Sequence, residues 1–362
     1  MNLDQTIELL QELIRARGPS GQEDEVRQIV LREMEKTCDK VWMDEAENAV
    51  GLIRGRGRAT RGKKTVAVPV VKVMAHLDEI SLIVKRIEPD GTLRVRPTGG
   101  LVPWLLGLGP VEIMAATGIL PGVLSVGAMH TTAESTAAWR SKVAGEGKSL
   151  DWPQIHVFTR MTAEALAEAG VRPGTRVVVP RDRRNLTVIN DCIGGYFMDD
   201  RASLAILLAA AALMKSAKKR PAADVYLIGT CGEEIGAGAA AFASGSIPGT
   251  ITLAVDVGPV AAEYGTRLTV DPIIVHRDGR SVYTRSVCER LDKIGRGLGM
   301  APQHAYLESY GSDASISRTT GHAAKTGLLC VPTENTHGFE ILPRAALDAC
   351  ARLLAGFLEA PV

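Results

Sequence analysis

Two adjacent carboxylates, Glu233 and Glu234, lie in the sequence GTCGEEIGAGAA, residues 229–240. The apolar run 225–228 before them predicts a strand, and the small residues after them predict a tight turn. Neighbouring side chains in such a turn can point in different directions. One carboxylate can then bind a metal ion, while the other takes a proton from water and returns it to a leaving amine. This pair therefore indicates amide hydrolysis.

Other residues of metal-binding type follow further predicted strands or, in GGYFMDDR, open a predicted helix. They lie in the motifs VMAHLDEI, GGYFMDDR, LAVDVG and VPTENTHGFE, and they are His76, Asp78, Asp199, Asp200, Asp256 and His337. Because ligands of open α/β sheets bind beyond the carboxyl ends of the strands, we expect these side chains to converge. Imidazole and carboxylate groups are typical zinc ligands, and one carboxylate can bridge two ions about 3.5–4 Å apart. The set predicts a two-metal site with one spare glutamate.

The glycines after the two glutamates allow a different interpretation. The run GAGAAA, 236–241, fits the dinucleotide-binding pattern G-x-G-x-x-A, and Asp256 follows at a suitable distance. However, Glu233 and Glu234 separate the glycines from the strand. They would place two negative charges beside a pyrophosphate, which needs hydrogen-bond donors. A nucleotide site is therefore disfavoured, and the sequence has no G-x-S-x-G motif for a serine nucleophile.

The elements that must position these residues alternate between helices and strands. Apolar spacing predicts helices at 3–17, 22–35, 201–216, 282–298 and 344–358. Predicted strands lie at 41–43, 49–53, up to 75, 80–87, 224–228, 251–255, 303–307 and 327–331. Strands separated by helices predict an α/β fold with a mainly parallel sheet between helical layers.

The middle of the chain has a different pattern of predicted elements. From about residue 85 to 190, short strand-like pieces alternate with turns such as PTGG, LPG and VRPG, with one helix predicted at 162–169. We therefore predict an α/β catalytic domain over 1–84 and 191–362, interrupted by a β-rich, barrel-like domain over 85–190. The basic run 54–64 is interpreted as a solvated hairpin loop, and no role is assigned to 130–150.

Composition excludes several classes of partner. The net charge of +1 over 362 residues argues against general nucleic-acid binding. The longest apolar stretch, 204–214, is too short to cross a membrane, and the charged N-terminal segment does not resemble a signal peptide. The six cysteines form no C-x-x-C pair, which is typical of reduced thiols. We predict a cytoplasmic protein without a membrane or nucleic-acid partner.

Six motifs in order along nearly the whole chain resemble the tetrahedral, or glutamyl, aminopeptidases of peptidase family forty-two. They are GPSGQEDEVR, AHLDEISLIVKRIEPDGTLRVRPTGG, MDDR, GEEIGAGAA, AVDVG and GSDAS. The resemblance implies a zinc-exopeptidase-like fold and two divalent cations, expected to be zinc, with cobalt or manganese as alternatives. It also implies that the insertion mediates dimerisation, and that dimers build shells of twelve subunits.

The resemblance also implies a role for each site residue. One metal would be bound by His76 and Asp256, and Asp199 would bridge to a second metal bound by Glu234 and His337. Glu233 would be the general base, and Asp78 would orient the imidazole of His76.

The substrate side departs from the family pattern. Glu334 and Asn335 precede His337 where an Arg-Tyr-type stretch is usual, and Gly338 and Phe339 follow it. GSDAS likewise replaces the usual Gly-Thr-Asp-Ala. The sequence therefore leaves two hydrolases open: an aminopeptidase acting on free peptides, and a deacylase or amidase acting on an N-acylated amino acid or dipeptide. A binding or assembly protein with a vestigial site is a third alternative, disfavoured because every expected ligand is present.

Overall fold

A computed structural model describes residues 1–56, 59–61, 64–66, 69–128, 130–132, 134, 150–218 and 220–359. The contacts of the chain divide it into two units. The first comprises Met1–Glu79, Leu186–Thr336 and Glu340–Val362, and the second comprises Ile80–Asn185 with His337–Phe339. The predicted α/β fold with a β-barrel is confirmed, and each unit is described in turn.

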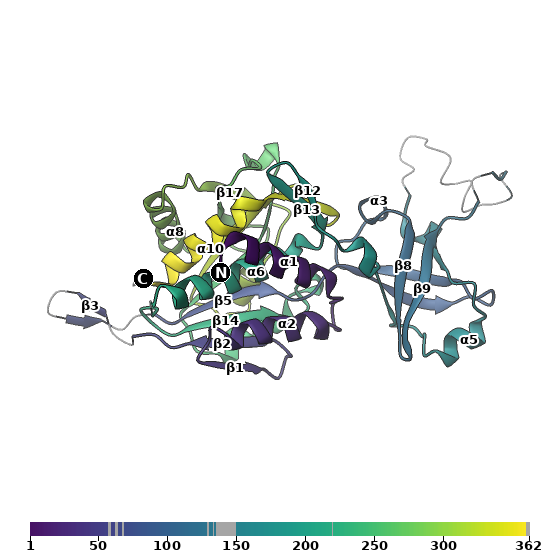
Figure 1. Cartoon of the computed structure of the whole chain (residues 1–362), viewed down its shortest axis with the longest axis horizontal. Helices are drawn as coiled ribbons and strands as arrows, with labels where there is room; N and C mark the ends of the chain where they lie inside the picture. The colour runs from purple at the N-terminus through teal and green to yellow at the C-terminus, as the bar shows by residue number, and fades with distance from the viewer. Residues whose placement is uncertain are drawn as a thin grey trace. The chain divides into compact units, whose positions relative to one another are not determined.

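An eight-stranded mixed sheet forms the centre of the first unit (Figure 1). Its order is β1 (Lys40–Met43), β2 (Ala49–Ile53), β14 (Val225–Thr230), β5 (Val71–His76), β15 (Ile251–Pro259), β18 (Lys325–Thr333), β16 (Ile273–Asp278) and β17 (Gln303–Leu307). The four central strands, β14, β5, β15 and β18, are parallel. In their register Thr230 lies opposite His76, and Asp256 lies opposite Cys330. The carboxyl ends of these strands therefore meet at one edge of the sheet, here called the rim.

Helices cover both faces of this sheet. One face packs against α1 (Leu3–Arg15), α2 (Asp24–Glu35), α6 (Met198–Ser216), α8 (Arg285–Gly297) and α10 (Arg344–Glu359). The other packs against α7 (Gly238–Ser246) and α9 (Asp313–Thr319). Successive β5 residues alternate between the two cores, with Val73 on the first face and Met74 on the second. Because both faces of the sheet are covered, the sequences of β5 and β15 are nearly continuous apolar runs.

Helix α6 is central to the packing and to the site. In Figure 1 it lies beside α1 and α10, and it contacts both of them as well as β5 and β15. Met198 belongs to a separate turn before a kink, and the regular part of the helix begins at Arg201, as predicted. Asp199 and Asp200 have non-helical backbone angles inside it. The first turn of α6 is thus irregular where the predicted bridging aspartate lies.

Two smaller β-structures complete the first unit. A three-stranded sheet joins β12 (Thr187–Ile189), β13 (Cys192–Tyr196) and β19 (Phe339–Pro343), and β13 leads into α6. A hairpin of β3 (Ala59–Arg61) and β4 (Lys64–Val66) occupies the basic run predicted as a hairpin loop. Residues 57, 58, 62 and 63 of that run lie outside the described residues.

The second unit is a closed antiparallel barrel of six strands. Their order is β10 (His156–Phe158), β7 (Leu93–Thr98), β6 (Ser81–Ile87), β11 (Arg176–Val178), β8 (Gly109–Ala115) and β9 (Gly118–Ser125). Short helices α3 (Pro103–Leu106) and α5 (Ala163–Glu168) accompany them. Trp152 is buried and its Nε1 donates to the carbonyl of Leu101 at 2.9 Å. Most of the segment 130–150, for which no role is predicted, lies outside the described residues.

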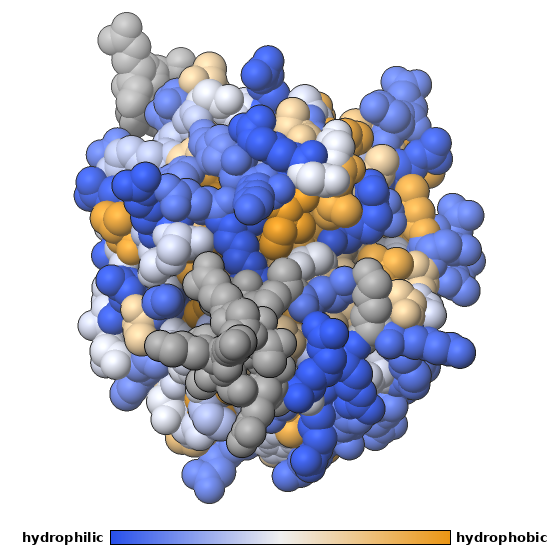
Figure 2. Space-filling view, turned by 90° about the vertical axis from the view of Figure 1, so that its left-hand side faces the viewer, coloured by the Kyte–Doolittle hydropathy of each residue, from blue (hydrophilic) through white to orange (hydrophobic). Residues whose placement is uncertain are grey.

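The described helices are all too short or too polar to cross a membrane. The face of the molecule in Figure 2 is mainly hydrophilic, and its apolar residues form small groups between charged ones.

Candidate metal centre

The predicted site begins at the rim of the central sheet. His76 is the last residue of β5, and Thr230, which pairs with it, ends β14 just before the Glu233–Glu234 turn. Asp256 lies in β15 two residues beyond Ala254, which pairs with Met74. The parallel register therefore brings a histidine, an aspartate and two glutamates from three strands to one edge.

His76 is held at both ring nitrogens. Its Nε2 lies 2.8 Å from Asp199 Oδ1, and its Nδ1 lies 3.1 Å from the carbonyl oxygen of Asp78. The ring is buried, with the residue 2% exposed. Burial lowers the pKa of His76, but the carboxylates of Asp200, Asp199 and Asp78 outweigh this and raise the pKa well above its usual value. The Nε2 atom of this ring points at Asp199, the carboxylate predicted to bridge.

The irregular start of α6 fixes two acidic side chains. The backbone N–H of Asp199 donates to Glu340 Oε2 at 2.9 Å. The next residue, Asp200, accepts a hydrogen bond at Oδ2 from the backbone N–H of His76 at 3.0 Å. The departure from helical angles thus ties the helix start both to the end of β5 and to Glu340.

Four side chains form a group with the spacing of a metal site. His76, Asp199, Asp200 and Asp256 each offer one ligand atom, and these atoms lie within 4.8 Å of one another. Burial, followed by the charge of Asp199, raises the pKa of Asp256 to about 8. Burial and the charge of Asp256 likewise raise the pKa of Asp200. Such crowding of buried carboxylates is unfavourable without a compensating positive charge.

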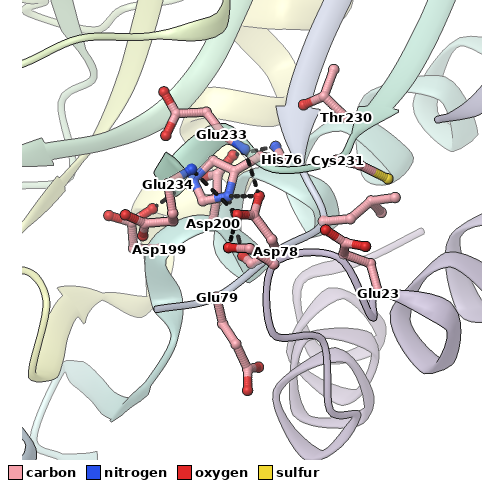
Figure 3. A network of polar contacts seen from close by, with 12 residues as sticks. Glu23, His76, Asp78, Glu79, Asp199, Asp200, Thr230, Cys231, Glu233 and Glu234 are labelled. Carbon is pink, nitrogen blue, oxygen red and sulfur yellow. Dashed lines mark hydrogen bonds and ion pairs between the residues drawn. The ribbon is translucent and has the colours of Figure 1, made fainter. Parts of the chain in front are cut away.

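The two glutamates of the turn point in different directions. They form a short 3-10 helix, Glu233–Ile235, after Gly232, whose φ of 63° is in the left-handed region. Figure 3 shows the side chain of Glu234 turned toward Asp199 and that of Glu233 turned away from it. Oxygens of Asp199 and Glu234 lie within 4.8 Å of each other. Burial is the main cause that raises the pKa of both glutamates well above the usual value.

Asp78 connects this turn to His76. Its carboxylate accepts hydrogen bonds from the backbone N–H groups of Glu233 and Glu234 at 2.9 and 3.2 Å, and from Ser20 Oγ at 2.7 Å. Its Oδ1 also lies 3.3 Å from His76 Nδ1. Burial raises the pKa of Asp78, but the contacts with His76, Ser20 and Glu233 outweigh it, so the pKa is lowered. One buried carboxylate thus holds both the histidine and the glutamate turn.

The donor set fits divalent cations. Imidazole and carboxylate ligands are those of zinc and related ions, and several buried acids here share one histidine. Asp200 Oδ1 is buried and has no hydrogen-bond partner among the described residues. A cation at the rim would neutralise the repelling carboxylates.

His337 belongs to the second unit by its contacts. Its Nδ1 lies 3.3 Å from the carbonyl oxygen of Gly100, which can only accept, so Nδ1 donates. A Cβ at position 100 would lie 2.7 Å from His337 Nδ1, so a larger residue there would displace the ring. The role of His337 as a metal ligand stays a prediction.

Sequence reasoning did not select two residues that contact the predicted site. Ser20 and Glu340 carry no recognisable signal, because their partners, Asp78 and Asp199, are far away in the chain. Asp200 is one of the side chains expected to converge, and it lies in the four-residue group with His76, Asp199 and Asp256. The non-helical backbone angles at the start of α6 were not predicted.

Replacing Asp78 with Asn should lower kcat or metal affinity by about 10- to 100-fold, as loss of a partner behind a metal ligand typically does. The amide NH₂ cannot accept from Ser20 or from the backbone N–H groups of the turn, so at least one buried hydrogen bond is lost. Metal titration and steady-state kinetics on the same preparation measure both effects.

The matched control is Asp348→Asn, which removes only an exposed ion pair with Arg352. It should leave kcat and metal affinity unchanged. Wild-type kinetics and metal affinity for Asp78→Asn would show that this carboxylate does not position the site.

The chain is similar to known proteins over nearly its whole length. The model of the M42 glutamyl aminopeptidase family matches residues 57–353. A lysyl aminopeptidase of Pyrococcus furiosus is 26% identical over 365 residues, covering 97% of this chain and 96% of the relative. The putative aminopeptidase FrvX of Escherichia coli is 25% identical, covering 97% of this chain and 94% of the relative.

Solved structures are also similar over nearly their full length. An aminopeptidase of the archaeon Desulfurococcus kamchatkensis has a TM-score of 0.86 at 26% identity, covering 99% of this chain and 96% of that one. The TET1 peptidase of Pyrococcus horikoshii, whose structure is described as assembling into a tetrahedron or a large octahedral shell, has a TM-score of 0.80 at 23% identity. It covers 98% of this chain and 99% of that one, and at this identity the likeness shows the fold.

Proposed function

Because the chain belongs to the M42 glutamyl aminopeptidase family, we propose that it is a metal-dependent aminopeptidase that removes N-terminal residues from peptides. Two divalent cations, expected to be zinc and with cobalt or manganese as alternatives, would be held by His76, Asp199, Glu234, Asp256 and His337. The observation that carries the proposal is the cluster of His76, Asp199 and Asp256 ligand atoms within 4.8 Å at the rim.

The residues divide into ligands and positioning groups. Asp199 is proposed to bridge, because one of its oxygens faces His76 Nε2 and its carboxylate also lies near Glu234. Asp78 fixes the ring of His76 through Nδ1, which leaves Nε2 for a metal. The contact of His337 Nδ1 with the carbonyl oxygen of Gly100 would likewise orient that ring with Nε2 toward a metal.

Glu233 is proposed as the general base. When bound, the cations would polarise the scissile carbonyl and lower the pKa of water. Glu233 is next to the proposed ligand Glu234 but is directed away from Asp199, so its carboxylate is free for proton transfer (Figure 3). It would accept a proton from the attacking water and donate it to the leaving amine. Burial raises the pKa of Glu233, which makes it a stronger base than an exposed glutamate.

Charge at the rim supports a substrate with a free N-terminus. Six acidic side chains gather here and make the rim acidic; they are Asp78, Asp199, Asp200, Asp256, Glu233 and Glu234. An acidic rim favours a substrate that brings an α-ammonium group over an N-acylated one, which brings none. The unusual residues around His337 keep an N-acyl amino acid or dipeptide as the alternative to be tested.

Paired substrates test this proposal. The zinc-loaded protein should release the N-terminal residue from a library of free peptides, and it should cleave the N-acetylated forms of the same peptides at least about 100-fold more slowly. Mass spectrometry of the products measures both rates in one mixture. Cleavage confined to the acetylated peptides would replace the aminopeptidase by a deacylase. Failure to cleave either set at full metal loading would favour a vestigial site.

The barrel is proposed to mediate self-association. Val123 of β9 pairs with Phe158 of β10, and both side chains are exposed, with relative exposures of 42% and 48%. An apolar cross-strand pair on the outside of a barrel is suited to burial against a second copy. The shell described for the TET1 peptidase supports a homo-oligomer for this chain, with a dimer as its first step.

A further inference from the structure

Two exposed histidines form a second group of metal-ligand type, with residues that the rim does not use. His276 Nε2 lies 2.8 Å from His304 Nδ1, and the ring centroids are 5.1 Å apart with planes tilted by 37°. Both residues are exposed to solvent, and His304 has 40% of its side-chain surface exposed. The two rings thus face each other through nitrogen atoms at the surface of the first unit.

The local fold aims these rings at each other. His304 is on β17, the edge strand of the large sheet, and His276 is on the neighbouring strand β16. Val275 pairs with Ala305 and Arg277 with Tyr306, so His276 is an extra residue in a bulge. A bulge redirects a side chain relative to the regular alternation of a strand. The irregularity therefore falls on the residue whose ring meets His304.

A carboxylate fixes the protonation of the pair. His304 Nε2 lies 3.0 Å from Asp292 Oδ1 on α8, and Arg296 Nε lies 3.0 and 2.9 Å from the two oxygens of that carboxylate. A carboxylate in an ion pair only accepts, so His304 donates from Nε2. In the neutral ring the lone pair is then on Nδ1, where it can accept from His276 Nε2–H.

We propose that a divalent transition-metal ion binds between His276 Nε2 and His304 Nδ1, in the place of this shared hydrogen. The proton of His276 moves to its Nδ1 through solvent, so both rings stay neutral and both facing nitrogens offer lone pairs. Water completes the coordination, since the site is at the surface. Asp292 then forms a carboxylate–histidine–metal arrangement, which orients the ring and increases the basicity of the ligand.

The dimensions and chemistry agree with this class of ion. Zinc–nitrogen bonds are about 2.0–2.1 Å long, so two nitrogens on one tetrahedral ion lie somewhat farther apart than the 2.8 Å seen between the rings. A small rotation of the exposed rings supplies that difference. Imidazole ligands suit zinc, copper and nickel, and copper is bound most tightly of these. Copper(II) is therefore the sensitive probe.

The test uses the full chain with its rim already loaded with zinc. Dialysis against copper(II) should add one equivalent of copper per chain with a two-nitrogen electron paramagnetic resonance signal, while elemental analysis shows the zinc content unchanged. Both His276→Ala and His304→Ala should lose this equivalent, and Asp292→Asn should weaken it by about 10- to 100-fold. His322→Ala, which removes another exposed histidine, is the matched control and should bind copper like wild type.

Two results would overturn the proposal. One is wild-type protein that takes up no additional copper; the other is an additional equivalent that survives in both histidine variants. Peptide hydrolysis should be unaffected in all these variants. A loss of the copper signal can therefore be distinguished from damage to the metal site at the rim, which would lower hydrolysis. Because the rings are exposed, the variants should also keep the thermal midpoint of wild type in the absence of copper, which checks their folding.

Discussion

Replacing Glu233 with Gln is expected to lower kcat by about 10³-fold, a typical contribution of general acid–base catalysis, with little change in metal content. The amide has nearly the same size, and the backbone N–H of residue 233 keeps its hydrogen bond to Asp78. What is lost is the ability to accept a proton from water and pass it to the leaving amine. Steady-state kinetics on a free peptide, with elemental analysis of the same sample, measures the two quantities separately.

Two comparisons make this result specific. Glu263→Gln changes an exposed glutamate on the loop after β15 and should keep the wild-type kcat. Glu234→Gln removes a proposed ligand, so its loss of activity should be accompanied by a loss of bound metal. A near-normal rate for Glu233→Gln with the metal in place would show that another group transfers the proton.

Removal of the metal with a chelator is expected to abolish hydrolysis and to lower the thermal midpoint. The cations are expected to stabilise the transition state by about 4 kcal/mol, and losing this stabilisation lowers the rate by about 10³-fold. The folded chain also loses the free energy of binding, which is about 4.1 kcal/mol when the metal is present at 1,000 times its Kd. The buried carboxylates of Asp199, Asp200 and Asp256 would then repel one another without compensation.

Re-addition of metal provides the control for this prediction. Zinc, cobalt and manganese are added separately to the apoprotein, and activity and melting temperature are followed for each. Recovery of both with the same ion would assign it to the rim. Hydrolysis that continues at the wild-type rate in chelator, with no metal in the sample by elemental analysis, would rule out a metal-dependent reaction.

Much of the fold is readable from the sequence because its strands are buried on both faces. The runs that form β5, β14 and β15 are apolar and are bounded by turn residues, so strands there could be predicted. Their ends were less well predicted, because β15 continues to Pro259, beyond the predicted end at 255. The strand order could not be predicted. β16 runs antiparallel to β18 and lies between it and β17, an arrangement decided by packing and not by any local pattern.

The candidate site likewise contains residues that could be predicted from the sequence and contacts that could not. His76 and Asp256 could be selected because the carboxyl ends of parallel strands meet at one edge, a rule that needs only the strand ends. Asp200 was also among the candidates, but its hydrogen bond from the backbone N–H of His76 could not be predicted, since it depends on non-helical angles at the start of α6. Glu340 and Ser20 each form a hydrogen bond with a distant residue of the site, and no spacing in the sequence predicts such pairs.

The several contacts of Asp78 also bear on when the enzyme becomes active. Its partners come from residue 20 near the N-terminus and from residues 233 and 234, which are separated from it by 58, 155 and 156 positions in the chain. Contacts of such long range form only after most of the chain has been synthesised and has collapsed. A growing or half-folded polypeptide therefore has no working centre. Hydrolysis is therefore expected only after folding has brought residues 20, 78, 233 and 234 together.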